Sequence, residues 1–323
     1  MKFANVLVVG GSGFIGRHLV ASLAAAGLRV TVPSRRRERA KHLILLPTVD
    51  VVEADVMAPG VLERLCTGKQ AVYNLVGILH SRRGRKDERG ANDYGPDFAR
   101  MHVELPQAIV AACRAKGVRR ILHMSALGAS PTGPSEYLRS KGIAERALLA
   151  AEDLDVTIFR PSVVFGPEDK FLNRFALMAK LAPAIGVPCP DAKFQPVYVG
   201  DVARAMHYAL EDPDARGQVY ELGGPRVYTM KELVEFVCAA IHRRRLVVGL
   251  PDRLSYLQAW MLEHLPGKLM TRDNYRSMQV ANTTQAEFPF RLQPQSMELV
   301  APAYLAPSGP RERYPQLRWR ARR

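Results

Sequence analysis

The sequence contains little cysteine, and its four cysteines stand far apart. Cys66, Cys113, Cys189 and Cys238 form no Cys-x-x-Cys pair, which is the spacing that zinc sites and thiol–disulfide centres commonly use. We therefore expect reduced cysteines that pack as small apolar side chains, and neither a disulfide framework nor a metal site.

Long apolar runs are also lacking. Charged residues, glycine or proline interrupt every apolar stretch well before the roughly 18 residues that a membrane-spanning helix needs. Residues 1–5 lead directly into a strand-like pattern, without the apolar region and cleavage site of a signal peptide. These absences predict a cytoplasmic protein, and they leave open a peripheral position at the inner face of a membrane.

Acidic residues are scarce relative to basic ones. The chain has 31 Asp and Glu against 46 Lys and Arg, a net charge of +15. This balance favours anionic partners such as phosphorylated cofactors or an anionic membrane surface. No recognised nucleic-acid-binding motif accompanies the charge, so we expect no nucleic acid partner. The basic clusters lie at residues 35–39, 82–89, 243–245 and 311–323, where a solvated surface is the simplest interpretation.

Short apolar runs alternate with helical patterns in the first half of the chain. Runs typical of strands buried on both faces lie at residues 6–9, 28–32, 49–52, 71–75, 120–124 and 156–159. Helical patterns follow the first run up to residue 26 and cover residues 96–116 and 137–151. The alternation predicts an α/β fold with a Rossmann-type, doubly wound parallel sheet over residues 1–165.

The rhythm changes after residue 165, where several prolines interrupt the chain. We expect a smaller C-terminal α/β substrate subdomain at residues 166–285, interleaved with the Rossmann sheet. A basic, Pro-rich, extended tail is expected at residues 286–323, and a polar, basic loop at residues 80–95. Residues 254–262 have an amphipathic helical pattern, for which core packing and contact with a membrane or partner both remain open.

A glycine-rich motif follows the first expected strand and opens the first expected helix. Its glycines are Gly10, Gly13 and Gly16. Glycine permits a tight turn and close approach of the backbone to a pyrophosphate, and a helix amino terminus supplies free N–H groups. The context predicts a dinucleotide site, with further contacts from Ser12, Phe14 and Ile15.

The end of the second expected strand bears on the choice of cofactor. Proteins that prefer NAD usually place Asp or Glu there, but this chain has no carboxylate before Glu38. Ser34 and Arg35 instead suit a 2′-phosphate, because arginine binds phosphate through charge-assisted, bidentate bonds. The sequence therefore favours NADP(H) over NAD(H), with ordinary surface charge as the alternative interpretation of the arginines.

Two further strand ends are expected to line the cofactor. Asp55 and Val56 follow the third strand and fit a position beside the adenine, although Asp55 would serve equally as a helix N-cap. Asn74, Val76 and Gly77 close the fourth strand, where a plain turn is the alternative.

Three residues form a candidate catalytic set. Tyr137 and Lys141 are four residues apart at the start of a helical pattern, so they share one helix face. Ser125 ends the strand at 120–124, at the edge where ligands of open α/β sheets bind. Bringing a phenol from a pKa near 10 to about 7 takes about 4 kcal/mol, which one cation at about 4 Å supplies before desolvation opposes it.

We therefore predict that Ser125 binds a substrate oxygen and that Tyr137 exchanges a proton with it, while Lys141 stabilises the phenolate. Hydride would move to or from the nicotinamide, with Tyr137 and Lys141 also contacting the cofactor.

These motifs resemble those of the extended or atypical short-chain dehydrogenases/reductases. Stretches at 74–79, 123–129, 160–169 and 195–203 are also similar to bacterial relatives of the NADPH-binding accessory subunit of respiratory complex I. The likeness covers residues 4–280 and implies a tightly held NADPH. It implies that Pro161, Ser162 and Val163 lie near the nicotinamide, with a rigid strand exit as the alternative. It also implies that Asp201 helps to close the substrate side, unless Asp201 is an N-cap.

One stretch departs from the pattern of this group. His102 lies in the helix before the Ser125 strand, where active extended members commonly carry Asn. Two functions therefore stay open. The first is an NAD(P)H-dependent oxidoreductase, or an epimerase or dehydratase variant, acting on a carbonyl, alcohol or quinone-related substrate. The second is a non-catalytic protein that holds NADPH as a structural or redox-sensing ligand at a respiratory complex or membrane. The complete Ser–Tyr–Lys set favours the enzyme.

Overall fold

Strand β1 (Asn5–Val9) lies in a seven-stranded sheet with the order β11-β6-β5-β4-β1-β2-β3. Val6 and Val8 enter the hydrophobic core on one face of the sheet, and Leu7 and Val9 enter the core on the other. A strand that is apolar on both faces needs helices on both faces.

The structure, a computed structural model, describes residues 3–82, 94–265 and 269–306.

All pairings in this sheet are parallel. The order is that of the Rossmann fold with one more strand added beyond β6. The predicted doubly wound parallel sheet is therefore confirmed, and the six strands expected in the first half of the chain all form. The other strands of this sheet are β2 (Arg29–Ser34), β3 (Val49–Glu53), β4 (Ala71–Asn74), β5 (Arg120–Met124), β6 (Asp155–Pro161) and β11 (Val219–Leu222).

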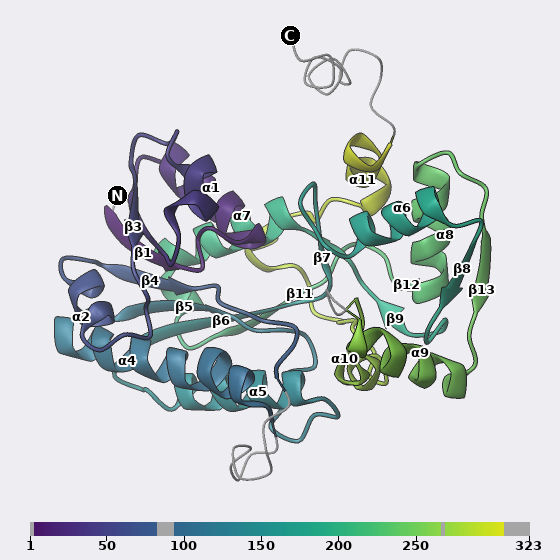
Figure 1. Cartoon of the computed structure of the whole chain (residues 1–323). Coiled ribbons are helices and arrows are strands. Elements are labelled where there is room, and N and C mark those ends of the chain that lie inside the picture. The colour runs from purple at the N-terminus through teal and green to yellow at the C-terminus, as the bar shows by residue number, and fades with distance from the viewer. Residues whose placement is uncertain (1–2, 83–93, 266–268, 307–323) are drawn as a thin grey trace.

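Helices cover both faces of the sheet, as Figure 1 shows. One face carries α1 (Phe14–Ala25) and α7 (Val199–Glu211), and the other carries α2 (Val61–Cys66), α4 (Leu105–Lys116) and α5 (Glu136–Leu149). The short α3 (Pro96–Phe98), the π-helical turn η3 (Ala99–Glu104) and α4 follow one another without a break. The 3-10 turn η1 (Arg37–Leu43) follows β2, and η4 (Pro213–Ala215) follows α7.

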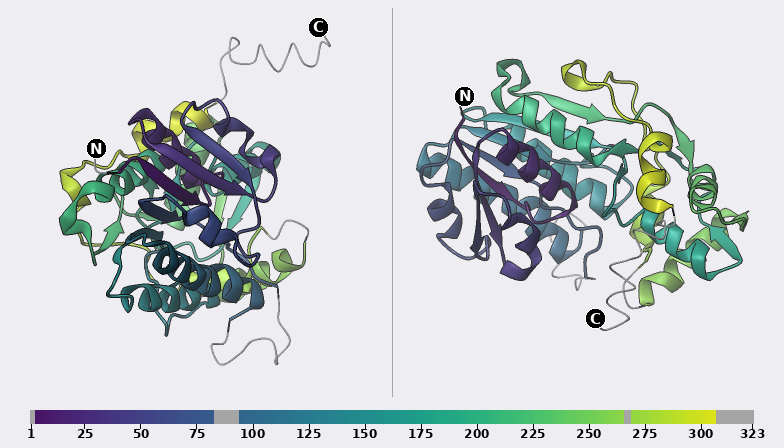
Figure 2. Two further views of the ribbon diagram at one scale, coloured as in Figure 1. Left: turned by 90° about the vertical axis from the view of Figure 1, so that its left-hand side faces the viewer. Right: turned by 90° about the horizontal axis from the view of Figure 1, so that it is seen from above.

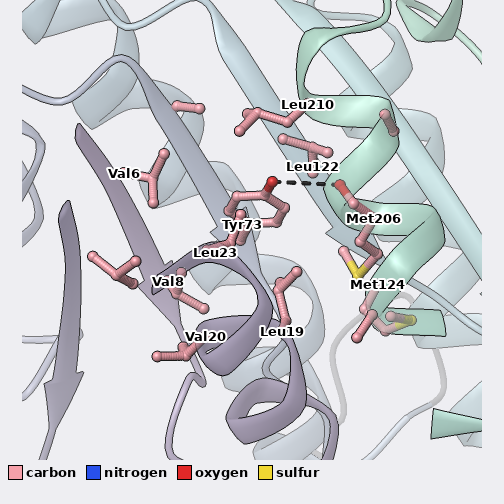
Figure 3. Packing of buried hydrophobic residues seen from close by; sticks show 14 of the residues in the cluster. Val6, Val8, Leu19, Val20, Leu23, Tyr73, Leu122, Met124, Met206 and Leu210 are labelled. Atoms are coloured by element: carbon pink, nitrogen blue, oxygen red, sulfur yellow. Dashed lines mark hydrogen bonds between the residues drawn. The ribbon is translucent and has the colours of Figure 1, made fainter. Parts of the chain in front are cut away.

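The core between the sheet, α1 and α7 centres on Tyr73, which is fully buried (Figure 3). Its hydroxyl donates a hydrogen bond to the Met206 carbonyl at 3.4 Å, so the buried phenol keeps a polar partner. Leu19 and Leu23 of α1 pack in the same cluster, and burying each such side chain contributes about 2 kcal/mol. This packing holds α7 against the seven-stranded sheet, although α7 comes late in the sequence. We call the sheet with its covering helices the first lobe and the elements around the separate C-terminal core the second lobe.

The second lobe is built from short pieces around its own core (Figure 2). Its strands pair as β7–β10, β9–β12 and β8–β13. Helix α8 begins with a capping box between Thr229 and Glu232. No described helix is both long and apolar enough to span a membrane. The elements are β7 (Val164–Phe165), α6 (Leu172–Leu181), β8 (Ala184–Val187), β9 (Lys193–Phe194), β10 (Val197–Tyr198), β12 (Tyr228–Thr229), α8 (Met230–Ala240), β13 (Leu246–Gly249), α9 (Asp252–His264) and α10 (Arg272–Ser277).

The expectation of an extended tail after residue 285 is wrong for the described part of that segment. A 3-10 turn η5 (Pro289–Arg291) is followed by helix α11 (Met297–Leu305), which Ser296 caps. The internal Pro302 and the short length hide this helix in the sequence, but its packing stabilises it. Residues 307–323 and most of the expected basic loop, 83–93, lie outside the described residues.

The segment between η5 and α11 is fastened to α7. Buried Asp201 accepts a hydrogen bond from the Gln295 backbone N–H at 2.6 Å and forms an ion pair with Arg204. The N-cap of α7 is Tyr198, so the N-cap alternative for Asp201 is wrong. Asp201 instead joins the chain's late segment to the first lobe.

Replacing Met297 with alanine should lower the free energy of unfolding by about 3 kcal/mol, because its side chain is 1% exposed in the second-lobe core. The matched change Leu299→Ala lies on the same helix, where the side chain is 71% exposed, and should cost less than about 0.5 kcal/mol. Chemical denaturation measures both. Equal losses would contradict the packing of α11.

Candidate functional site

The glycine-rich turn between β1 and α1 forms a cradle of backbone. Gly10 has a backbone φ of +87°, which residues other than glycine rarely adopt. A Cβ on Gly16 would overlap the Gly10 carbonyl and the Gly11 backbone. Gly13 is the N-cap of α1, and no side chain in the described part of the protein caps that end. The first N–H groups of α1 are therefore available to an anion such as a pyrophosphate.

This turn lies at the point where the strand order reverses. Strands β1 and β4 are neighbours in the sheet, and a Cβ on Gly10 would lie 3.0 Å from the Leu75 carbonyl carbon. The reversal leaves a crevice at the carboxyl ends of the strands, which is where open α/β sheets bind ligands. The structure thus brings the predicted residues of the glycine turn and of the β4 end together.

Asn74 organises the loop after β4. Its side chain is buried; its Oδ1 accepts the Val76 N–H, and its Nδ2 donates to His123 Nδ1, both at 3.2 Å. Burial and the nearby Lys141 lower the pKa of His123 well below its usual value. The neutral ring therefore accepts at Nδ1. Asn74 thus fixes the course of the loop that follows the strand.

The ends of β2 and β3 lie on the other side of the turn. Val32 of β2 contacts the position of Gly11, and the buried Ser34 donates its hydroxyl to the Arg36 carbonyl at 2.9 Å. Arg35 is exposed beside it. These positions leave the Arg35 guanidinium accessible to a phosphate at the strand end.

Asp55 and Val56 follow β3. Asp55 Oδ1 accepts the Met57 N–H at 3.1 Å, whereas α2 begins after Gly60, so Asp55 is not the N-cap of that helix. Its other oxygen lies 3.8 Å from a guanidinium nitrogen of Arg100 in an exposed pair. Val56 packs partly against the core under the sheet.

Lys141 projects from α5 to the carboxyl ends of two strands. Its ammonium donates to the Met124 carbonyl at 2.9 Å and to the Val76 carbonyl at 3.4 Å. Burial lowers the pKa of Lys141 to about 8, and the Glu145 carboxylate opposes this shift. Lys141 therefore joins the β4 loop, the β5 end and α5 at one point.

Ser125 directly follows β5 next to this point. Its backbone N–H donates to the Phe159 carbonyl at 2.7 Å. Its side chain is buried, and the hydroxyl has no hydrogen-bond partner within residues 3–82, 94–265 and 269–306. A buried hydroxyl without a partner costs free energy unless a ligand satisfies it, which fits the predicted contact with a substrate oxygen.

Tyr137 stands one helical turn before Lys141 on α5. Its ring packs edge-on against the rings of Phe98 and His102. Burial raises the pKa of Tyr137 to about 12, the opposite direction from the shift that Lys141 alone was expected to produce. The physical reason is that desolvation of the phenolate dominates here. Tyr137 is therefore protonated at neutral pH and able to donate a proton.

His102 occupies a buried position in the π-helical turn η3. Its Nε2 accepts the Ile78 N–H at 3.0 Å, and its Nδ1 lies 2.9 Å from the Ser140 hydroxyl. Since Ser140 donates its proton to the Tyr137 carbonyl at 2.8 Å, Nδ1 of His102 must be the donor. Burial, reinforced by Lys141, lowers the pKa of His102 to about 2. This neutral histidine ties the β4 loop to the turn of α5 that carries Tyr137.

Ser135 is the N-cap of α5 and accepts the Leu138 N–H, and sequence reasoning missed a second acceptor at this helix end. Asp273 of α10 accepts the N–H groups of Glu136 and Tyr137 at 2.7 and 3.1 Å. A carboxylate at a helix amino terminus satisfies free donors and complements the helix dipole. The two segments are 136 residues apart in the chain, so no local pattern indicates the contact.

The segment after β6 lies beside Ser125. Pro161 accepts the Leu127 N–H at 3.0 Å through its carbonyl. Asn282 holds the next two residues, because its Oδ1 accepts from the Ser162 hydroxyl at 2.7 Å and from the Val163 N–H at 3.1 Å. Ser162 is thus engaged by the protein itself, and Asn282 is a second residue that sequence reasoning missed.

Together, the Rossmann sheet, the glycine turn and the Ser–Tyr–Lys set define a protein of the short-chain dehydrogenase/reductase class. The chain belongs to the NAD dependent epimerase/dehydratase family, whose pattern matches residues 6–223. A nicotinamide dinucleotide is the cofactor of this class, and the glycine cradle with the free amino terminus of α1 fits the pyrophosphate of such a group.

Individual relatives are consistent with this assignment. The chain is 36% identical over 260 residues to "NADH dehydrogenase (ubiquinone) 1 alpha subcomplex subunit 9, mitochondrial" of Arabidopsis thaliana, covering 78% of this chain and 61% of that protein. It is 32% identical over 250 residues to the ceramide reductase of Caulobacter vibrioides, covering 76% and 74% of the two chains. A nucleoside-diphosphate-sugar epimerase structure from Staphylococcus aureus superposes with a TM-score of 0.71 at 19% identity, over 91% of this chain and 98% of that chain. The predicted likeness to the complex I accessory subunit is confirmed.

The buried ammonium of Lys141 predicts a specific pH dependence of stability. Its pKa of about 8 in the folded chain lies below the ordinary 10.5, so the unfolded chain binds the proton more tightly. At pH 8 and below, this difference therefore lowers the free energy of unfolding by about 3 kcal/mol. The free energy of unfolding rises again as the pH increases from 8 toward 10.5. The Lys141→Met variant lacks the titration. Its unfolding free energy minus that of the native chain should thus decrease between pH 8 and pH 10, and a constant difference would contradict the burial.

Proposed function

We propose that this protein is an NADP(H)-dependent oxidoreductase that reduces a carbonyl group with Ser125, Tyr137 and Lys141. The observation that carries the proposal is the buried Ser125 hydroxyl, which has no partner among the described residues. Ser125 directly follows Met124, whose carbonyl holds the Lys141 ammonium, and the protonated Tyr137 lies one helical turn before Lys141 on α5. The same arrangement suits a carbonyl, alcohol or quinone-related substrate.

The protonation state of Tyr137 suits the role of proton donor. Bound NADPH would supply the hydride. The Ser125 hydroxyl would donate to the substrate carbonyl oxygen, and Tyr137 would give its proton to that oxygen as negative charge develops there. An alkoxide is about as basic as hydroxide, whose conjugate acid has a pKa near 15.7. Proton transfer from a phenol with a pKa of about 12 is therefore still downhill, although less so than from an ordinary phenol.

The remaining residues hold this arrangement. The Lys141 ammonium faces the site from the same helix face as Tyr137 and would stabilise the phenolate that proton transfer leaves. Neutral His102 fixes the β4 loop against α5, and Asp273 fixes the amino terminus of α5. His102 thus takes a positioning role at the place where active extended members commonly carry Asn.

The preference for NADP(H) is supported by the end of β2. The family takes its name from NAD, but an NAD-type carboxylate is missing from residues 33–37 of this sequence. Arg35 is exposed there and would bind a 2′-phosphate, whereas the Ser34 hydroxyl would have to leave the Arg36 carbonyl before it could join. The relative named as a ceramide reductase supports an apolar, lipid-like carbonyl compound as the substrate class.

A second candidate is supported by the plant relative, which is a subunit of NADH dehydrogenase. In this alternative the chain holds NADPH as a structural or redox-sensing ligand and contacts a respiratory complex. Both candidates are compatible with a cytoplasmic protein positioned peripherally at the inner face of a membrane. Slow exchange of bound NADPH and resistance to oxidation would favour the second candidate over the enzyme.

The Arg35→Asp variant should weaken NADPH binding at least 30-fold and NADH binding less than 3-fold, because only NADPH carries the 2′-phosphate. Fluorescence titration with both nucleotides measures this. Arg119→Asp makes the same charge change on an exposed residue just before β5, at the amino ends of the strands. It should alter neither affinity. Equal losses for both nucleotides in Arg35→Asp would refute the phosphate contact.

The Tyr137→Phe variant should bind NADPH as the native chain does and lose at least 100-fold in the rate of NADPH oxidation, because the proton donor is gone. A panel of aldehydes, ketones and quinones provides the acceptors. Tyr208→Phe, at an exposed position on α7, is the control and should retain full activity. Full turnover by Tyr137→Phe would remove Tyr137 from the mechanism.

A further inference from the structure

Helix α9 turns its apolar side away from the protein. It lies at the outer margin of the second lobe (Figure 1 and Figure 2). Its buried residues are the small Ser255 and Ala259, whereas a helix of a globular protein usually buries its apolar stripe. We use the name α9 face for its five exposed large apolar side chains: Leu254, Tyr256, Leu257, Trp260 and Met261.

Polar contacts hold the helix in this orientation. The Ser255 hydroxyl accepts the Cys189 N–H at 3.0 Å and lies 3.1 Å from the Leu250 carbonyl. Gln258 donates its side-chain amide to the Gly186 carbonyl at 3.2 Å. Rotating α9 to bury its leucines would break these bonds and bury polar groups without partners. The hydrogen bonds of Ser255 and Gln258 therefore keep the α9 face exposed.

Apolar exposure continues along the chain on both sides of α9. Leu265 and Leu269 follow the helix, and Leu246 and Val248 precede it on strand β13; all four are exposed. Apolar exposure that goes beyond scattered single residues is typical of a site for a protein partner or a membrane.

The charge around α9 favours an anionic occupant. Residues 243–276 contain six arginines and one lysine against three carboxylates, Asp252, Glu263 and Asp273. Arg253 and Arg276 are exposed, and neither forms an ion pair in the part of the chain that the structure describes. This segment thus combines exposed apolar side chains with an excess of positive charge.

We propose that the α9 face docks this protein onto an anionic lipid bilayer, with α9 lying in the plane of the interface. The leucines and Met261 would enter the boundary between head groups and acyl chains, as in other interfacial helices. Tyr256 and Trp260 have the apolar body and polar edge that suit the head-group level. Arg253 would lie against lipid phosphates. The inference deepens the peripheral membrane position proposed above and does not require turnover.

Helix α10 connects the α9 face to the catalytic helix. It is bound to α9 through Tyr275 and Arg272, and through Asp273 it caps α5 at Tyr137. Docking through α9 would therefore fix the orientation of the candidate active site relative to the bilayer, which suits a substrate that resides in the membrane.

The test uses the full chain and phosphatidylcholine vesicles with and without 30% phosphatidylglycerol. The variant Leu257→Glu/Trp260→Glu changes the α9 face, and Leu149→Glu/Leu299→Glu makes the same charge change at exposed leucines of α5 and α11. Co-sedimentation should show that the native chain and the control bind anionic vesicles, with at least 10-fold weaker binding by the α9 variant. NADPH binding by both variants reports that each is folded.

A second readout separates the α9 face from binding by charge alone, since residues 311–323 form a basic cluster in the sequence. In a Trp319→Phe background, Trp260 is the remaining tryptophan, and its emission should shift to the blue on anionic vesicles as its ring leaves water. Three results would overturn the proposal. These are unchanged vesicle binding by the α9 variant, no shift of Trp260 emission, or light scattering that shows the α9 variant dissociating a dimer, which would assign the face to a second copy.

Discussion

The burial of one ammonium group at the carboxyl ends of two strands is the constraint on which the site depends. Lys141 is held by the Met124 and Val76 carbonyls, so α5 must pack where β4 and β5 end. That placement brings Tyr137, one helical turn before Lys141, into a cluster with Ile78 of the β4 loop. Desolvation of the ammonium is unfavourable, and the two carbonyls compensate for part of it. The glycine turn must also approach the β4 loop closely, which explains the absence of a side chain at Gly10, whereas Gly16 lacks one because α1 packs against the turn itself.

Local patterns in the sequence carry much of this architecture. A buried parallel strand is apolar on both faces, so a short apolar run identifies it without tertiary information. The glycine motif and the four-residue spacing of Tyr137 and Lys141 can likewise be recognised from neighbouring residues alone. The contacts that complete the site are not local. Asp273 and Asn282 reach α5 and the β6 end from segments more than 100 residues away. Helix α11 escaped notice because Pro302 and a short length obscure its period. The pKa of Tyr137 depends on burial, which no spacing reveals.

The second lobe contributes residues that hold the site in place. Through Asp273 it holds the amino terminus of α5, which carries Tyr137 and Lys141, and through Asn282 it fixes the chain beside Ser125. The same lobe presents the α9 face, whose polar side is bonded inward and whose apolar side is exposed. A carbonyl reductase that acts on an apolar, membrane-resident substrate would need both features, namely a proton donor held rigidly and a surface that orients it toward the bilayer. Family membership alone assigns neither feature, because many reactions share this fold.

The most direct test of the central claim is a single-turnover measurement on protein loaded with one equivalent of NADPH. Nicotinamide fluorescence is followed after addition of aldehydes, ketones and quinones, lipid-like ones included, and the products are identified by mass spectrometry. The account predicts that at least one acceptor removes the fluorescence and yields one equivalent of reduced product with one of NADP⁺. Bound NADPH that stays reduced with every acceptor while exchanging slowly with free nucleotide would contradict it, and would make the nucleotide a structural or sensing ligand.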